Sequence, residues 1–103
     1  MTWRERRRAS REVDTAWRGV NALFPMRTDD APDDEWDVFA VVDEMLAAVA
    51  SRGSRGFRVA ASLAFADAVR RLGEHESTLD DAQRAAVGRL RAAVAAAESA
   101  SSR

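Results

Sequence analysis

The chain has 103 residues, with 16 arginines, no lysine, 17 carboxylates, one histidine, no cysteine and a formal net charge of −1. This length, with 47% hydrophobic and 32% charged residues, fits one globular domain with a modest core. The absence of cysteine excludes disulfides, thiol catalysis and cysteine-ligated metals. No apolar run is long enough to span a membrane, and the charged N-terminus is unlike a signal peptide. We therefore expect a cytoplasmic protein.

The first predicted element is a helix from about Trp3 to Phe24, which Pro25 ends because proline lacks the amide N–H. Its apolar side chains recur at helical spacing along one stripe. They are Val13, Ala16, Trp17, Val20, Leu23 and Phe24. Arginines surround the first turns on all sides, so we expect a solvated helix end or a frayed arm there.

The second predicted helix follows an acidic loop and runs to about Arg52, with Asp33 or Asp34 as its N-cap. Its apolar stripe consists of Trp36, Val38, Phe39, Val42, Met45, Leu46 and Val49. Carboxylates between residues 29 and 37 could suit a hard cation. They lack the alternate spacing and the glycine of a calcium loop, which favours capping and solubility, and we expect no metal or cofactor.

The third predicted helix runs from Ser54 or Arg55 to Leu72, where Gly73 favours a stop. Only two side chains between residues 59 and 69 are polar. A helix that is apolar on all sides is usually buried. We therefore expect this helix to be the most buried, and any part that four helices leave uncovered to mark self-association or partner binding.

The fourth predicted helix runs from Leu79 to about Ala97, and Thr78 with Asp81 has the spacing of a capping box. Gly88 lies inside this helix, where glycine costs about 1 kcal/mol relative to alanine. We expect a neighbouring helix to approach closely there, as at Gly19 in the first helix.

No segment shows the alternation of a strand. Four helices with short polar connections predict an all-α fold, a single antiparallel bundle of about four helices. Residues 1–103 would form one helical domain, with residues 1–8 and 99–103 fraying.

Charge is unevenly distributed: +4 over residues 1–27, −8 over residues 28–51, +4 over residues 52–73 and −1 over residues 74–103. The simpler interpretation is intramolecular, with an acidic second helix lying between basic first and third helices. The alternative is that the acidic and basic faces serve different partners.

The basic run near the N-terminus is the first candidate binding site. It comprises Trp3, Arg4, Arg6, Arg7, Arg8 and Arg11. Tryptophan and arginine dominate protein–protein hot spots, and the same residues can grip phosphates and stack on bases. Trp3 lies outside the apolar stripe, so it either packs at the helix end or is an exposed anchor. The slight net acidity of the chain disfavours nucleic acid. Replacement of every lysine by arginine, beside 22 alanines, is typical of a GC-rich genome and weakens the inference that each guanidinium was selected.

A second candidate, for an anion, comprises Arg52, Arg55 and Arg58 beside two glycines at the start of the third helix. The spacing is not that of a P-loop, and an ordinary interhelical turn is the simpler interpretation.

His75 is the single histidine and lies between two glutamates. Its surroundings have neither metal-ligand spacing nor a recognisable catalytic pattern, so we expect no enzyme.

The sequence therefore predicts a non-enzymatic helical protein–protein interaction module of a cytoplasmic bacterial type: an adaptor, accessory subunit or regulator. Its partner would be another protein or a second copy, as a homodimer. The alternative is a small nucleic-acid-binding regulator that uses the basic N-terminal helix.

Overall fold

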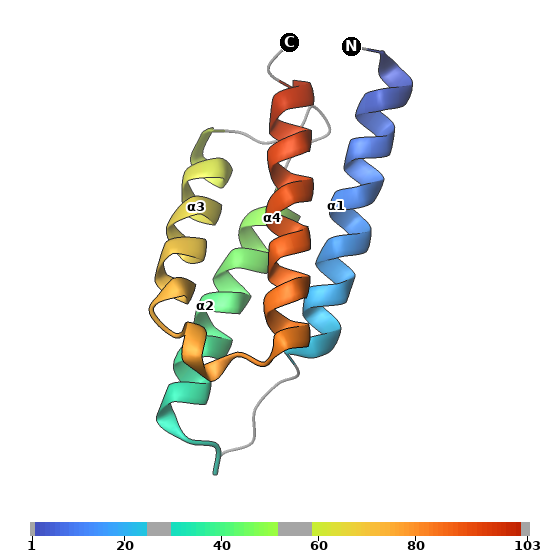
Figure 1. The fold of residues 1–103 in the computed structure, drawn as a ribbon. Helices are drawn as coiled ribbons and strands as arrows, with labels where there is room; N and C mark the ends of the chain where they lie inside the picture. The colour runs from blue at the N-terminus through green and yellow to red at the C-terminus, as the bar shows by residue number, and fades with distance from the viewer. Residues whose placement is uncertain (1, 25–29, 52–58, 102–103) are drawn as a thin grey trace.

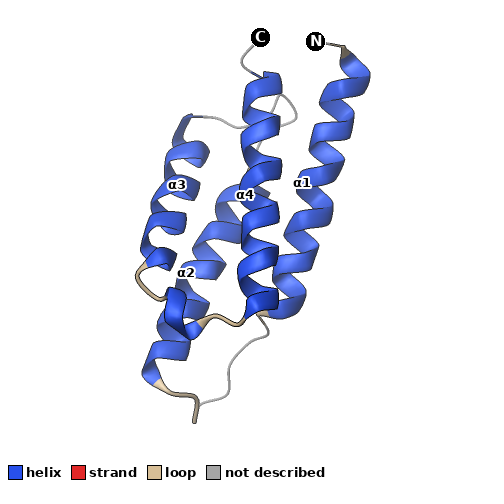
Figure 2. Ribbon diagram, in the orientation of Figure 1, coloured by secondary structure: helices blue, strands red, loops and turns tan. Residues whose placement is uncertain are grey.

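A computed structural model describes residues 2–24, 30–51 and 59–101. In these residues the chain forms helices and no strand. The helices are α1 (Trp3–Leu23), α2 (Asp33–Ala50), α3 (Val59–Gly73), the short 3₁₀ helix η1 (Glu76–Thr78) and α4 (Asp81–Ser101). Successive α-helices run in opposite directions, as Figure 1 shows, with helix dominating the described chain (Figure 2). The predicted all-α antiparallel bundle is thus confirmed.

The bundle consists of two helix pairs, because α1 packs mainly against α4 and α2 packs mainly against α3. The indole N–H of Trp17 joins the pairs by donating to the Leu46 carbonyl at 2.9 Å. At the C-terminal end of α1, the Gln83 side-chain amide of α4 donates to the Leu23 carbonyl at 3.1 Å. The result is an elongated molecule of 48 × 24 × 20 Å.

The apolar core is built more from α2 than from any other helix. Its buried side chains are Val38, Val41, Val42, Met45, Leu46, Ala48 and Val49. Met45 is fully buried, as is Leu90 of α4. The carboxylates of Asp37, Asp43 and Glu44 lie on the exposed side of α2, so the acidic segment combines a buried apolar face with a charged outer face.

The prediction that the third helix is the most buried was wrong. Among the side chains of α3 that the structure describes, from residue 61 onward, only Ala61, Phe65, Ala68 and Leu72 are buried, whereas Leu63 is 66% exposed. The physical reason is that α3 packs on α2 along one side and leaves its other sides open. Alanine fills much of the remaining surface, and it favours helices without needing burial.

The capping prediction for the fourth helix was also wrong. The box is formed by Asp80 and Gln83: the Gln83 N–H donates to the Asp80 carboxylate at 2.7 Å, and the Asp80 N–H donates to the Gln83 side-chain oxygen at 3.0 Å. Thr78 instead ends η1, so α4 begins two residues later than predicted. Leu79 precedes the helix and is nevertheless buried.

The ends of the other helices differ in detail from the prediction. Pro32 occupies the N-cap of α2 without a side-chain hydrogen bond, and Asp33 is the first helical residue. At the end of α3, the His75 N–H donates to the Leu72 carbonyl at 2.9 Å, a tightened 3₁₀-type turn. The predicted cap at Gly53 and the predicted start of the third helix lie outside the described residues.

The expected close approach of helices at Gly19 and Gly88 is not found. A Cβ atom added at either position would meet nothing within 4 Å. Both glycines lie on exposed faces of their helices. The sequence correctly placed both glycines inside helices, but it did not show that they face away from the neighbouring helices.

Charge sorting is confirmed for one pair of helices. The Arg71 guanidinium of α3 pairs with the Glu44 carboxylate of α2. The acidic second helix thus lies against the basic third helix as expected. The basic first helix has α4, rather than α2, as its main neighbour.

Candidate interaction surface

The N-terminal turn of α1 is held by a capping box. The Glu5 N–H donates to the Thr2 hydroxyl at 3.2 Å, and the Glu5 carboxylate accepts from the Thr2 N–H at 3.4 Å. These bonds satisfy two N–H groups that a helix end leaves without partners. The helix therefore begins at Trp3, and its first basic residues have helical positions.

Trp3 projects from this turn and is 66% exposed. Arg7, one turn later, places its guanidinium carbon 4.7 Å from the centroid of the tryptophan ring. This is a cation–π contact, worth about 0.5–1 kcal/mol at an exposed position. Of the two arrangements expected for Trp3, the structure thus has the exposed one, with the ring orientation restrained by Arg7.

The predicted partner-binding residues lie together on the first three turns of α1. We call them the Trp3 surface: Trp3, Arg4, Arg6, Arg7, Arg8 and Arg11. All six side chains are exposed. Within the described part of the chain, no carboxylate lies at ion-pair distance from any of these arginines.

The arginines of the Trp3 surface do not all point the same way. Helical spacing places Arg4, Arg7 and Arg11 along one outward stripe. Arg8 instead lines a hollow between α1 and α4, opposite Arg89. Alanines form much of this hollow: Ala9, Ala92, Ala93 and Ala96.

The second predicted site, Arg52, Arg55 and Arg58, lies outside the described residues, so that anion site stays a prediction. The described arginines of α3, Arg70 and Arg71, lie at its C-terminal end. Figure 1 shows this end at the opposite end of the bundle from the start of α1.

The two arginines at the end of α3 are neutralised by nearby carboxylates. Arg70 pairs with Asp67 at 2.9 Å and with Glu74 at 3.6 Å, and Arg71 pairs with Asp67 at 3.0 Å and with Glu44. The Arg70 hydrogen bond lowers the pKa of Asp67, and the hydrogen bond to Glu44 raises the pKa of Arg71. These charges support the fold and do not extend the Trp3 surface.

His75 is half-buried in the turn between α3 and η1. Its N–H donates to the Leu72 carbonyl, and its carbonyl accepts from the Thr78 N–H at 2.9 Å. The residue therefore shapes the turn through its main chain. The described residues contain no group of three carboxylate or histidine side chains placed to hold a metal ion.

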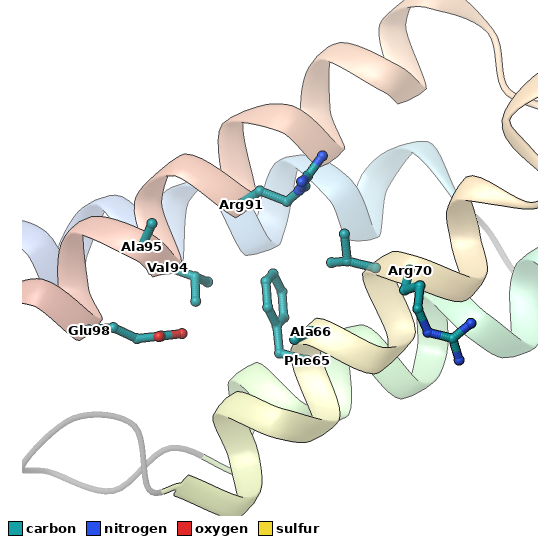
Figure 3. A pocket seen from close by; sticks show the side chains of 8 residues that line it. Phe65, Ala66, Arg70, Arg91, Val94, Ala95 and Glu98 are labelled. Carbon is teal, nitrogen blue, oxygen red and sulfur yellow. The ribbon is translucent and has the colours of Figure 1, made fainter.

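A groove runs between α3 and α4, where the two helices do not close on each other. Phe65 and Val69 of α3 and Val94 of α4 line it, with Arg91 and Glu98 along the α4 side (Figure 3). The groove continues past Val69 and Arg91 in the direction of η1. The sequence reasoning missed Arg91 and Glu98. Their separation of two helical turns was the available signal that they share a face.

The fold and these surfaces define the class of protein: a small antiparallel four-helix bundle with an exposed basic tryptophan surface and an apolar groove. No described helix is long and apolar enough to cross a membrane. No family model, curated protein or solved structure matches the chain.

Proposed function

We propose that the chain is a non-enzymatic helical protein–protein interaction module, an adaptor, accessory subunit or regulator that binds through the Trp3 surface. The observation that carries this proposal is the exposed Trp3 ring with Arg7 stacked on it. Tryptophan and arginine are the residues that most often dominate binding energy at protein interfaces.

The arrangement of the Trp3 surface favours affinity. The capping box and the cation–π contact restrain the ring before binding, which reduces the side-chain entropy lost when a partner orders it. Burying a tryptophan removes a large apolar area from water. The partner should therefore offer an apolar pocket for Trp3.

Charge indicates the surroundings of that pocket. Residues 2–12 carry five arginines and two glutamates, and Glu5 is engaged in the capping box. Carboxylates around the pocket would complement the exposed arginines and speed association at low salt. The proposed partner is thus a protein with an acidic rim around an apolar pocket.

The test is capture from a nuclease-treated lysate of the native host with the immobilised chain, followed by mass spectrometry. The immobilised Trp3→Ala variant and the triple variant Arg6→Ala/Arg7→Ala/Arg8→Ala should each fail to capture a specific partner. It should be retained with Leu63→Ala, a control of matched exposure on α3. Circular dichroism would check that each variant is folded. Equal capture by the Trp3→Ala variant and the natural chain would overturn the proposal.

A nucleic-acid-binding regulator is the second candidate, favoured by five exposed arginines beside a ring that could stack on a base. Against it, the other described basic cluster, at Arg70 and Arg71, is paired with carboxylates at the far end of the bundle. A mobility-shift titration at two salt concentrations separates the candidates. If the chain retards the nucleic acid at low salt and this binding weakens steeply as salt rises, the second candidate is favoured.

A further inference from the structure

The groove between α3 and α4 lies directly over buried core residues, with Phe65 6% and Val94 1% exposed. Phe65 and Val94 form its floor, and Ala66 and Ala95 lie at its sides (Figure 3). Small side chains on both walls leave room for another helix to approach. Leu63, 66% exposed, lies two turns before Arg70 on the outer side of α3 and extends the apolar surface beyond the groove.

Two opposite charges border this surface on α4 without pairing. Arg91 and Glu98 are seven residues apart, so they share one face of the helix but stand about 10 Å apart along its axis. Within the described residues neither side chain has an ion-pair partner. Glu98 is half-buried, and a charge removed from water without a partner is unfavourable.

These charges are placed symmetrically about the point between Val94 and Ala95. An antiparallel copy of α4, related by a two-fold axis through that point, would set Arg91 of each copy opposite Glu98 of the other. The exposed small residue Ala95 would then lie near its own copy at the centre. This self-complementarity is what a closed two-fold interface requires.

We infer that the occupant of the groove is a second copy of this chain, with the two α4 helices antiparallel across a two-fold axis. Both Arg91–Glu98 pairs would then form between the copies, and the exposed alanines of the groove, Ala66 and Ala95, would be covered. Stable interfaces bury roughly 1,200–2,000 Å² in total. The long α4 with the outer face of α3, including Leu63, supplies the contact surface. The inference concerns a different surface from Trp3 and does not depend on the proposed function.

The experiment is sedimentation equilibrium over low to high micromolar concentrations, with single and double charge reversals. The natural chain should dimerise. Arg91→Glu and Glu98→Arg should each raise the dimer dissociation constant about tenfold or more, because each places like charges opposite one another twice. The double variant Arg91→Glu/Glu98→Arg should restore dimerisation, since the pairs re-form with exchanged signs.

Mixing the two single variants supplies a second test. One variant then carries two glutamates and the other two arginines at positions 91 and 98, so an equimolar mixture should form heterodimers more tightly than either variant alone dimerises. This rescue also excludes misfolding as the cause of the losses.

Arg89→Glu is the matched control, because it makes the same charge change on the α1 side of α4. It should leave the dimer unchanged, as should Trp3→Ala. A monomer at all concentrations would overturn the inference and leave the groove to another occupant. The inference would also be overturned if Arg89→Glu weakened the dimer as much as Arg91→Glu does. It would be overturned, too, if the double variant Arg91→Glu/Glu98→Arg failed to restore dimerisation.

Discussion

The indole N–H of Trp17 in α1 donates a hydrogen bond to the main-chain carbonyl of Leu46 in α2, at 2.9 Å. It joins the α1–α4 pair to the α2–α3 pair at a place where α1 and α2 otherwise make little contact. The half-buried ring also packs against the core, so one side chain supplies both apolar contact and a directional bond between the two halves.

Trp17→Phe tests this connection. Phenylalanine keeps an aromatic ring and removes the N–H donor, so we expect the free energy of unfolding to fall by about 1 kcal/mol. Urea denaturation measures the difference. Trp3→Phe is the control, since its ring is exposed, and should change stability by less than about 0.5 kcal/mol. Equal effects of the two changes would contradict a structural role for the Trp17 bond.

Leu90 and Leu63 contrast a buried with an exposed leucine. Leu90→Ala should reduce the free energy of unfolding by about 2–5 kcal/mol, because it leaves a cavity in the core. Leu63→Ala should change it by less than about 0.5 kcal/mol at dilute concentrations where the chain is monomeric. A large loss at Leu63 under those conditions would mean that the outer face of α3 is covered within a single chain.

Asp80→Ala and Thr78→Ala distinguish two caps for α4. Asp80→Ala removes the acceptor of the Gln83 N–H, so we expect a loss of about 1 kcal/mol. Thr78→Ala should have a much smaller effect because Thr78 lies in η1 and makes no capping bond to α4. Thermal denaturation of both variants measures this, and the reverse order would place the cap at Thr78.

Gly19→Ala should stabilise the protein by up to about 1 kcal/mol. Position 19 is helical, exposed and free of neighbours, so alanine gains helix propensity without a clash. Gly73→Ala should increase the free energy of unfolding by less, because Gly73 is the last residue of α3 and helix propensity matters less at a helix end. Chemical denaturation measures both. Destabilisation by Gly19→Ala would reveal a close contact at that face.

Asp67 should contribute to acid sensitivity. The hydrogen bond from Arg70 lowers its pKa in the folded state, so the unfolded chain binds the proton more tightly. Its stabilising contribution is present above the ordinary aspartate pKa of about 4 and is lost as pH falls through the folded value. The stability difference between the natural chain and Asp67→Asn should therefore narrow in acid. High salt should shrink the difference at neutral pH, since the ion pairs are exposed.

Several features of the fold could be predicted because they depend on local physics. Helical spacing located the stripe that buries Val13, Ala16 and Val20, and proline and polar loops separated the helices near their observed ends. The sequence left open whether the arginine run is a solvated helix end or a frayed arm, and the structure has it as exposed helix. The local signals failed at the start of α4, where two overlapping motifs, Thr78 with Asp81 and Asp80 with Gln83, both have the spacing of a cap.

By itself, the sequence determined that the chain is helical, that polar connections separate its helices, and that the arginines near Trp3 form a basic run. Only the tertiary structure decided that α2 rather than α3 contributes most to the core, that Trp3 is exposed, and that Arg91 and Glu98 border an apolar groove. Periodicity identifies the apolar side of a helix, but the pairing of α1 with α4 and α2 with α3 decides how much of that side is covered.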